Sequence, residues 1–178
     1  MADYIFNVAR LLREPSGASR SFEVEAPREA LDVDELVGAV RGQVRLLRLA
    51  DSILATGQFL TPVETPCARC LDPVRLNLPF EISDAYVPLL DPLTGAPAPP
   101  DAEAYRLDDR HNLDLSLVLG EAVVAALPFV VLCRPDCPGL PGVAPAASRA
   151  EPASVDPRWA ALHELRQRMA SDRSPSRG

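Results

Sequence analysis

The sequence contains no lysine, so all 18 of its basic residues are arginine, and 25 acidic residues give a net charge of −7. Sequence-independent binding to nucleic acid depends on many cations that neutralise phosphates, and this balance disfavours it. A local arginine patch or a protein partner stays open. Aromatic residues make up only 5% of the chain, whereas apolar residues make up 47%. We therefore expect a core built mostly from Leu, Val and Ala.

The sequence also lacks long apolar runs and catalytic signatures. No run approaches the ~20 residues needed to cross a bilayer. The first residues lack the basic and apolar regions of a signal peptide. We therefore expect a cytoplasmic protein without a membrane partner. The two histidines lie far apart, and no Ser/His/Asp set, carboxylate pair or nucleotide-binding glycine loop is present. We expect neither an enzyme nor a small-molecule substrate.

Alternation of apolar and polar residues predicts several strands that bury one face. The clearest alternation lies at 74–82, where apolar side chains face one way and Pro79 lies on the other face, which indicates an edge strand or a bulge. Two N-terminal strands, separated by a turn at Glu14–Gly17, could form a hairpin. The runs that predict strands are 4–8, 21–26, 40–47, 53–63 and 74–83.

Two segments carry helical patterns. The first, about 114–127, has Asp114 as a plausible N-cap and ends before Pro128. Because it is apolar nearly all round, we expect it to be buried against the sheet. The second, about 156–170, begins with Asp156 as N-cap and Pro157 at the first helical position. Its apolar stripe, which we expect to dock on the body of the protein, comprises Trp159, Leu162, Leu165 and Met169.

These patterns predict an α+β fold, with a twisted antiparallel sheet or a partly open β-barrel, one buried helix and an outer C-terminal helix. We expect a single domain over residues 1–137, with a Pro/Ala-rich flexible loop at 91–104. A Pro/Ala-rich linker at 138–155 would join it to the C-terminal helix at 156–170. The last residues, 171–178, should be a disordered tail.

The four cysteines form a C-x-x-C pair, Cys67 and Cys70, and a C-x-x-x-C pair, Cys133 and Cys137. Three interpretations stay open. The two pairs could make a closed four-thiolate zinc site, which would be structural. Alternatively, Cys67 and Cys70 could be a thiol redox pair, although such pairs usually lie at a helix N-terminus. Thirdly, the thiols could be remnants that bind no metal.

Several short motifs, taken together in their order, resemble the YceD family, the large ribosomal RNA subunit accumulation proteins of bacteria and plastids. The similarity covers roughly residues 40–168. One departure stands out: many family members have further cysteines where Pro141 and Ala144 lie here, so any metal would need both remaining pairs. The segments that carry the resemblance are Leu54–Gly57 with Cys67–Pro73, the strand through Glu81, Asp114–Pro128, Leu132–Leu140, and Asp156–Leu162.

The resemblance implies a non-catalytic factor that supports the synthesis, processing or stability of large-subunit ribosomal RNA. Its partners would be ribosomal RNA, a large-subunit ribosomal protein or an assembly factor. The arginines that we expect to contact RNA or a partner are Arg45, Arg69, Arg75 and Arg158. If their strands pair, the first three could share a solvent-exposed face of the sheet near the C-x-x-C. A solvated face balanced by acids is the alternative. A thiol redox protein remains the alternative function.

Overall fold

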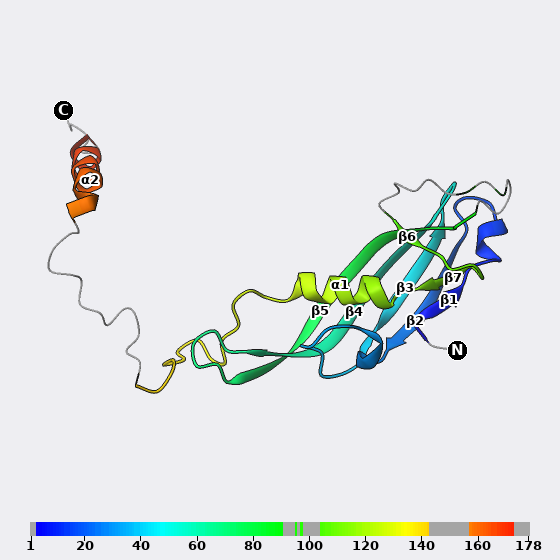
Figure 1. Cartoon of the computed structure of the whole chain (residues 1–178), viewed down its shortest axis with the longest axis horizontal. Helices are drawn as coiled ribbons and strands as arrows, with labels where there is room; N and C mark the ends of the chain where they lie inside the picture. The colour runs from blue at the N-terminus through cyan, green and yellow to red at the C-terminus, as the bar shows by residue number, and fades with distance from the viewer. Residues whose placement is uncertain (1–2, 91–94, 96, 98–103, 143–156, 173–178) are drawn as a thin grey trace, which may run out of the picture. The chain divides into compact units, whose positions relative to one another are not determined.

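A computed structural model describes residues 3–90, 95, 97, 104–142 and 157–172 (Figure 1). The fold is α+β, as predicted. The chain divides into two compact units, residues 1–137 and residues 138–178. The strands are β1 (Ile5–Asn7), β2 (Ser19–Ala26), β3 (Val40–Arg48), β4 (Ile53–Pro66), β5 (Pro73–Val87), β6 (Tyr105–Arg106) and β7 (Asn112–Asp114). The helices are α1 (Ser116–Ala126) and α2 (Ala160–Asp172), with 3-10 turns η1 (Leu11–Arg13), η2 (Arg28–Ala30) and η4 (Pro157–Trp159).

The main sheet has the strand order β2-β3-β4-β5-β6 and does not close into a barrel. Strands β2 to β5 form an antiparallel meander (Figure 1). The two-residue strand β6 adds to β5 in parallel, so the sheet is mixed rather than purely antiparallel. Of the two predicted architectures, the open twisted sheet is therefore the correct one. The predicted loop at 91–104 lies mostly outside the described residues, as do the linker at 138–155 and the tail at 171–178.

Strands β4 and β5 form a long hairpin, paired from Ile53 with Tyr86 to Pro66 with Pro73. Strand β6 pairs with β5 only at Tyr86 and Val87. Around Pro79, the described residues therefore provide β5 with a strand partner on one edge only. The prediction of an edge position for Pro79 is confirmed, since a proline has no N–H to donate to a further strand.

The inner face of the sheet is apolar because every second side chain of each strand points to it, and these apolar side chains lie next to one another on neighbouring strands. Its centre is a pair of stacked rings, Phe59 and Phe80, whose centroids lie 5.5 Å apart. Gly42 lies opposite Phe59 in the register, and a Cβ at Gly42 would lie only 2.6 Å from Cδ1 of Phe59. A glycine is thus required where this ring covers the backbone of the neighbouring strand.

Helix α1 packs mainly against β5 and buries Val118, Leu119 and Val123. The carboxylate of Asp114 accepts a hydrogen bond from the Ser116 N–H at 2.8 Å, just before the first turn. The predicted helix and its burial against the sheet are confirmed, but its other side is not covered. Leu117 and Val124 are 60% and 56% exposed. A helix can turn only one side toward an open sheet, so a helix that is apolar all round has its other side uncovered by that sheet.

The N-terminal strands do not form the suggested hairpin. Strand β1 pairs instead with β7, with Phe6 opposite Leu113, while β2 pairs with β3. Next to this second small sheet, the Leu115 N–H at the start of α1 donates to the Tyr4 carbonyl oxygen at 3.1 Å. Tyr86 of the main sheet donates its hydroxyl to the Asp114 carbonyl oxygen at 2.9 Å, which ties the two sheets together.

In the second unit, η4 and α2 cover residues 157–172, close to the helix predicted at 156–170. Residue 156, the predicted N-cap, lies outside the described residues. The side chains of the apolar stripe are between 52% and 64% exposed: Trp159, Leu162, Leu165 and Met169. The docking of this stripe on the body of the protein stays a prediction.

The packing of Phe59 over Gly42 predicts a large effect of one methyl group. In Gly42→Ala, the new Cβ would lie 2.2 Å from the Gln58 carbonyl oxygen, so β3 and β4 must separate. We expect the free energy of unfolding to fall by about 2 kcal/mol or more, measured by urea denaturation. The control is Gly120→Ala in α1, whose Cβ would lie 3.7 Å from Cγ2 of Val33. Its helix propensity should raise stability by up to about 1 kcal/mol. Unchanged stability in Gly42→Ala would contradict this packing.

Candidate metal centre

The C-x-x-C pair forms the turn of the β4–β5 hairpin. The Cys67 N–H donates to the Asp72 carbonyl oxygen at 2.8 Å, and the Leu71 N–H donates to the Cys67 carbonyl oxygen at 3.0 Å. Leu71 has a φ of 65°, a left-handed conformation that is unusual for a leucine. This tight turn brings both thiols of the pair to the tip of the hairpin.

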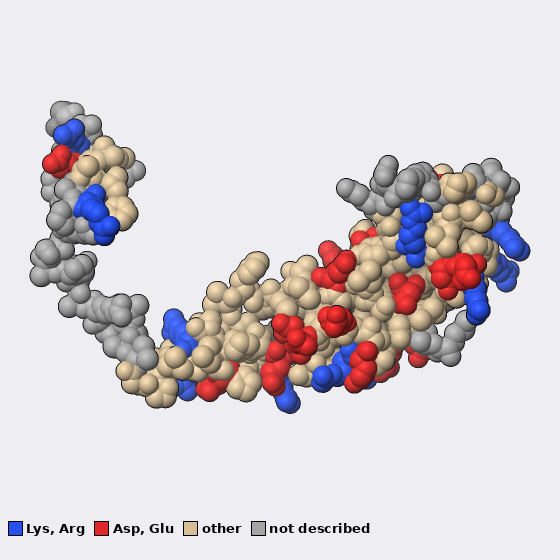
Figure 2. Space-filling view, viewed as in Figure 1, with Lys and Arg blue, Asp and Glu red and all other residues tan. Residues whose placement is uncertain are grey.

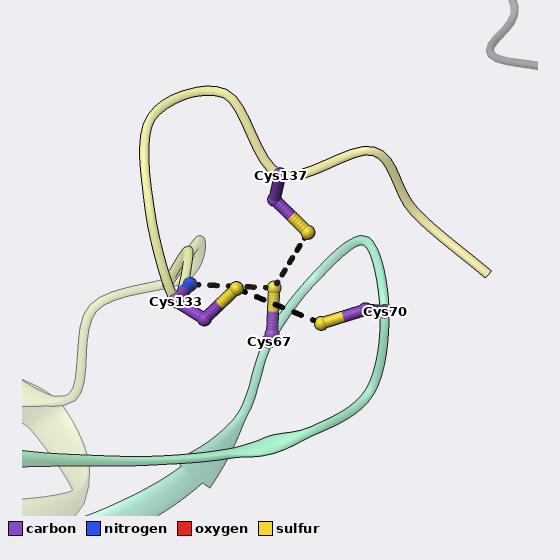
Figure 3. Close-up of side chains that lie close together, drawn as sticks. All are labelled: Cys67, Cys70, Cys133 and Cys137. Carbon is purple, nitrogen blue, oxygen red and sulfur yellow. Dashed lines mark hydrogen bonds between the residues drawn. The ribbon is translucent and has the colours of Figure 1, made fainter. Parts of the chain in front are cut away.

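The C-x-x-x-C pair follows α1 and returns to the same tip. The Ala68 N–H donates to the Val131 carbonyl oxygen at 2.8 Å, which joins the two segments directly before Cys133. A short turn, closed by the Cys137 N–H on the Arg134 carbonyl oxygen at 3.1 Å, separates the two cysteines. Figure 3 shows the four side chains pointing toward one another from the two segments.

All four sulfur atoms lie within 4.8 Å of one another. The Sγ atoms of Cys67 and Cys137 are 3.8 Å apart, and those of Cys70 and Cys133 are 3.7 Å apart. None of the four is in a disulfide. Cys67 and Cys137 are buried, Cys70 is half-buried and Cys133 is exposed. The chain thus brings together two thiol pairs more than sixty residues apart.

This donor set fits a tetrahedral metal ion. Zinc bonds thiolates at about 2.3 Å, so the sulfurs of a regular tetrahedral site lie about 3.8 Å apart. The spacings of 3.7 and 3.8 Å match that requirement. Four thiolates leave no open position for a water or a substrate, so such a site would be structural. Both cysteine pairs lie at the same end of the domain, as one shared ion requires.

Backbone N–H groups directed at Cys67 favour its thiolate form. They belong to Cys70, to Arg69 at 3.5 Å and to Cys133 at 3.4 Å, and they lower the pKa of Cys67 from 9.0 to about 6. The neighbouring thiols behave oppositely. The Asp72 N–H lowers the pKa of Cys70, but burial and the thiols of Cys67 and Cys137 raise it by more. The net effect is a raised pKa for Cys70. The Cys137 thiol, together with burial, raises the pKa of Cys133. One thiolate thus forms easily, and further negative charge requires a cation.

Arg45 and Arg75 lie on the same outer face of the sheet, but the arginine candidates do not cluster. Arg69 lies at the cysteine turn, and its guanidinium donates to the carbonyl oxygens of Cys137 at 3.0 Å and Pro135 at 3.5 Å. Arg75 donates to Glu64 at 2.7 Å. Arg45 lies opposite Thr56, which lies opposite Ser83. Ser83 is eight residues along β5 from Arg75, about 27 Å at the rise of an antiparallel strand.

Arg158 belongs to η4 in the second unit, whereas the other three arginines belong to the first unit. Contacts of the four arginines with RNA or a partner stay a prediction. Nothing in the local sequence pattern distinguishes Arg69 from Arg75, so the contact of Arg69 with the second cysteine segment could not be predicted. That role depends on residues 135–137, which are distant in the sequence.

No helix among the described residues is long and apolar enough to cross a bilayer. No solved structure matches the chain. Two mycobacterial proteins are similar to it over most of its length. "Uncharacterized protein Rv2926c" of Mycobacterium tuberculosis is 31% identical over 169 residues, which cover 89% of this chain and 79% of that protein. "Uncharacterized protein ML1660" of Mycobacterium leprae is 26% identical, with 90% of this chain and 76% of that protein covered.

The family model "Large ribosomal RNA subunit accumulation protein YceD" matches residues 55–166, a range that includes all four cysteines, the long hairpin beyond its first residues, and α1. A match over more than half of the chain confirms the resemblance found in the sequence motifs. The chain belongs to the YceD family of large ribosomal RNA subunit accumulation proteins.

Proposed function

We propose that the protein is a non-catalytic factor that supports the accumulation of large-subunit ribosomal RNA, and hence assembly of the large ribosomal subunit. The observation that carries this proposal is family membership over the segment that builds the hairpin, α1 and the cysteine cluster. The site chemistry agrees with it, because a closed four-thiolate cluster is a structural element rather than a reaction centre. Its partners would be ribosomal RNA, a large-subunit ribosomal protein or an assembly factor.

We propose further that Cys67, Cys70, Cys133 and Cys137 hold one structural zinc ion. A bound ion would join the hairpin turn to the segment after α1, and the free energy of binding would add to the stability of the folded state. The Arg69 guanidinium would support it by holding the backbone that carries Cys137.

The redox alternative is disfavoured by the arrangement of the thiols. A C-x-x-C redox pair closes a disulfide between its own two cysteines, whereas the sulfur contacts here run across the segments, from Cys67 to Cys137 and from Cys70 to Cys133. In addition, Cys67, which has the lowered pKa, has no exposed surface. Its position in a strand turn also lacks the helix N-terminus that usually activates such a thiol.

Loss of the protein should lower the large ribosomal subunit relative to the small one. In cells depleted of the protein, we expect a smaller large-subunit peak in a sucrose gradient and less large-subunit ribosomal RNA relative to small-subunit RNA. Re-expression of the wild-type chain is the control. A subunit ratio that stays at the wild-type value after depletion would refute the ribosomal proposal.

The metal site predicts about one zinc ion per chain when the protein is purified without chelator and analysed by mass spectrometry. Cys70→Ser should lose the ion and melt at a lower temperature. Arg69→Ala should retain the fold but bind zinc about 10- to 100-fold more weakly, because the loop that carries Cys137 loses its anchor. The matched control is Arg75→Ala, which breaks only the ion pair with Glu64. Wild-type protein without stoichiometric zinc would exclude the site.

The pKa directions predict how many protons leave when zinc binds. With its pKa near 6, Cys67 is already a thiolate at pH 7, whereas Cys70 and Cys133, whose pKa values are raised, still carry protons. Zinc binding at pH 7 should therefore release two or three protons, and affinity should fall as the pH falls. Calorimetry in buffers of different ionisation enthalpy measures this number. Release of four protons would show that Cys67 is not a thiolate in the free protein.

A further inference from the structure

Helix α1 presents an apolar stripe on the side that faces away from the sheet. Leu117 and Val124 are seven residues apart and hence on one side of the helix, and both are more than half exposed. Gly120 and Glu121 lie between them on the same side. A helix that is apolar all round is normally covered on every side. Among the described residues, the sheet covers the inner side of α1, and on the outer side only Gly120 is buried, next to Val33.

This stripe lines a groove of about 540 Å³ between α1 and the segment that contains η2. Gly120, which has no side chain, leaves the space between Leu117 and Val124 free, and Asp32 lies on the opposite wall. A groove with two apolar anchor positions one heptad apart suits an amphipathic protein segment. The apolar surface continues beyond the helix, where Phe129 and Val130 are fully and largely exposed.

Each wall of the groove carries one acidic residue, Asp32 on one side and Glu121 on the other. Residues 28–37, which include the opposite wall, contain four acids and one arginine. That arginine, Arg28, is paired with Glu29 at 3.8 Å. On the helix side, Glu121 accepts a hydrogen bond from the Tyr105 hydroxyl. In the space-filling view, acidic side chains are scattered over this unit with uncharged surface between them (Figure 2). A basic occupant would find complementary charge at both walls.

The geometry points to this groove as a docking site for a basic protein segment that carries apolar anchor residues. Nucleic acid fits it poorly, because phosphates would meet Asp32 and Glu121. The groove thus specifies the chemical character of the partner in the proposed function. The inference rests on that function only for the expectation that the partner belongs to large-subunit assembly. Ribosomal proteins have the required basic character.

Site-specific photo-crosslinking in growing cells tests this inference on the full chain. A benzoylphenylalanine residue replaces Val124 in one strain. In the control strain it replaces Leu60, which is 49% exposed on the outer face of the sheet, away from α1. We expect the probe at position 124, and not at position 60, to crosslink to a Lys- or Arg-rich protein segment identified by mass spectrometry. Crosslinks to RNA, to a second copy of this chain or to its own residues 157–172 would each overturn the proposal, as would equal yields from both positions.

A binding measurement then uses that crosslinked segment as a synthetic peptide. The double variant Leu117→Ser/Val124→Ser removes both anchors and should bind the peptide at least about tenfold more weakly. Leu60→Ser should bind like wild type. Glu121→Gln should weaken binding at low salt and have little effect at high salt. Equal affinity of the double variant and wild type would overturn the proposal. The subunit ratio after depletion separately tests the proposed function, so the two can fail independently.

Discussion

The tie between the tip of the β4–β5 hairpin and the segment after α1 is the contact on which the rest of the site depends. The hairpin carries Cys67 and Cys70 beyond the part of the sheet that α1 covers, and the chain must return along it before Cys133. The hydrogen bond from Ala68 to Val131 and the Arg69 contacts with the carbonyl oxygens of Pro135 and Cys137 align the two segments without involving the thiols. The thiols therefore converge through backbone and guanidinium contacts, and a metal ion would strengthen an arrangement that already exists.

Helix α1 connects this tie to the core. Its inner side packs on β5, and its C-terminal end leads directly into the segment that returns to the hairpin. At its start, Tyr86 and the small β1–β7 sheet fix its position relative to the main sheet. The candidate metal centre and the proposed docking groove thus lie on neighbouring segments of the chain.

The sequence predicted the strands of the meander well because each strand buries one face. Burial of one face requires apolar and polar residues to alternate, and this alternation is visible in the sequence. It predicted β1 as a strand but not its pairing, since the partner of Phe6 is Leu113, more than a hundred residues away, and no local pattern encodes that pairing. The buried side of α1 could not be identified either, because both sides are apolar. For the cysteines, spacing indicated two pairs, but their convergence depended on the path of residues 128–132. The anchoring role of Arg69 had no local signature.

The central physical claim is that four thiolates surround one ion at the hairpin tip. X-ray absorption at the zinc edge on the purified full-length protein tests it most directly, because this measurement counts the atoms bound to the metal and their type. A four-thiolate site predicts four sulfur atoms at about 2.3 Å from the zinc ion and no nitrogen or oxygen atom bound to it. A first shell with two sulfur atoms completed by oxygen or nitrogen would contradict it, since the two cysteine pairs would then not share one ion.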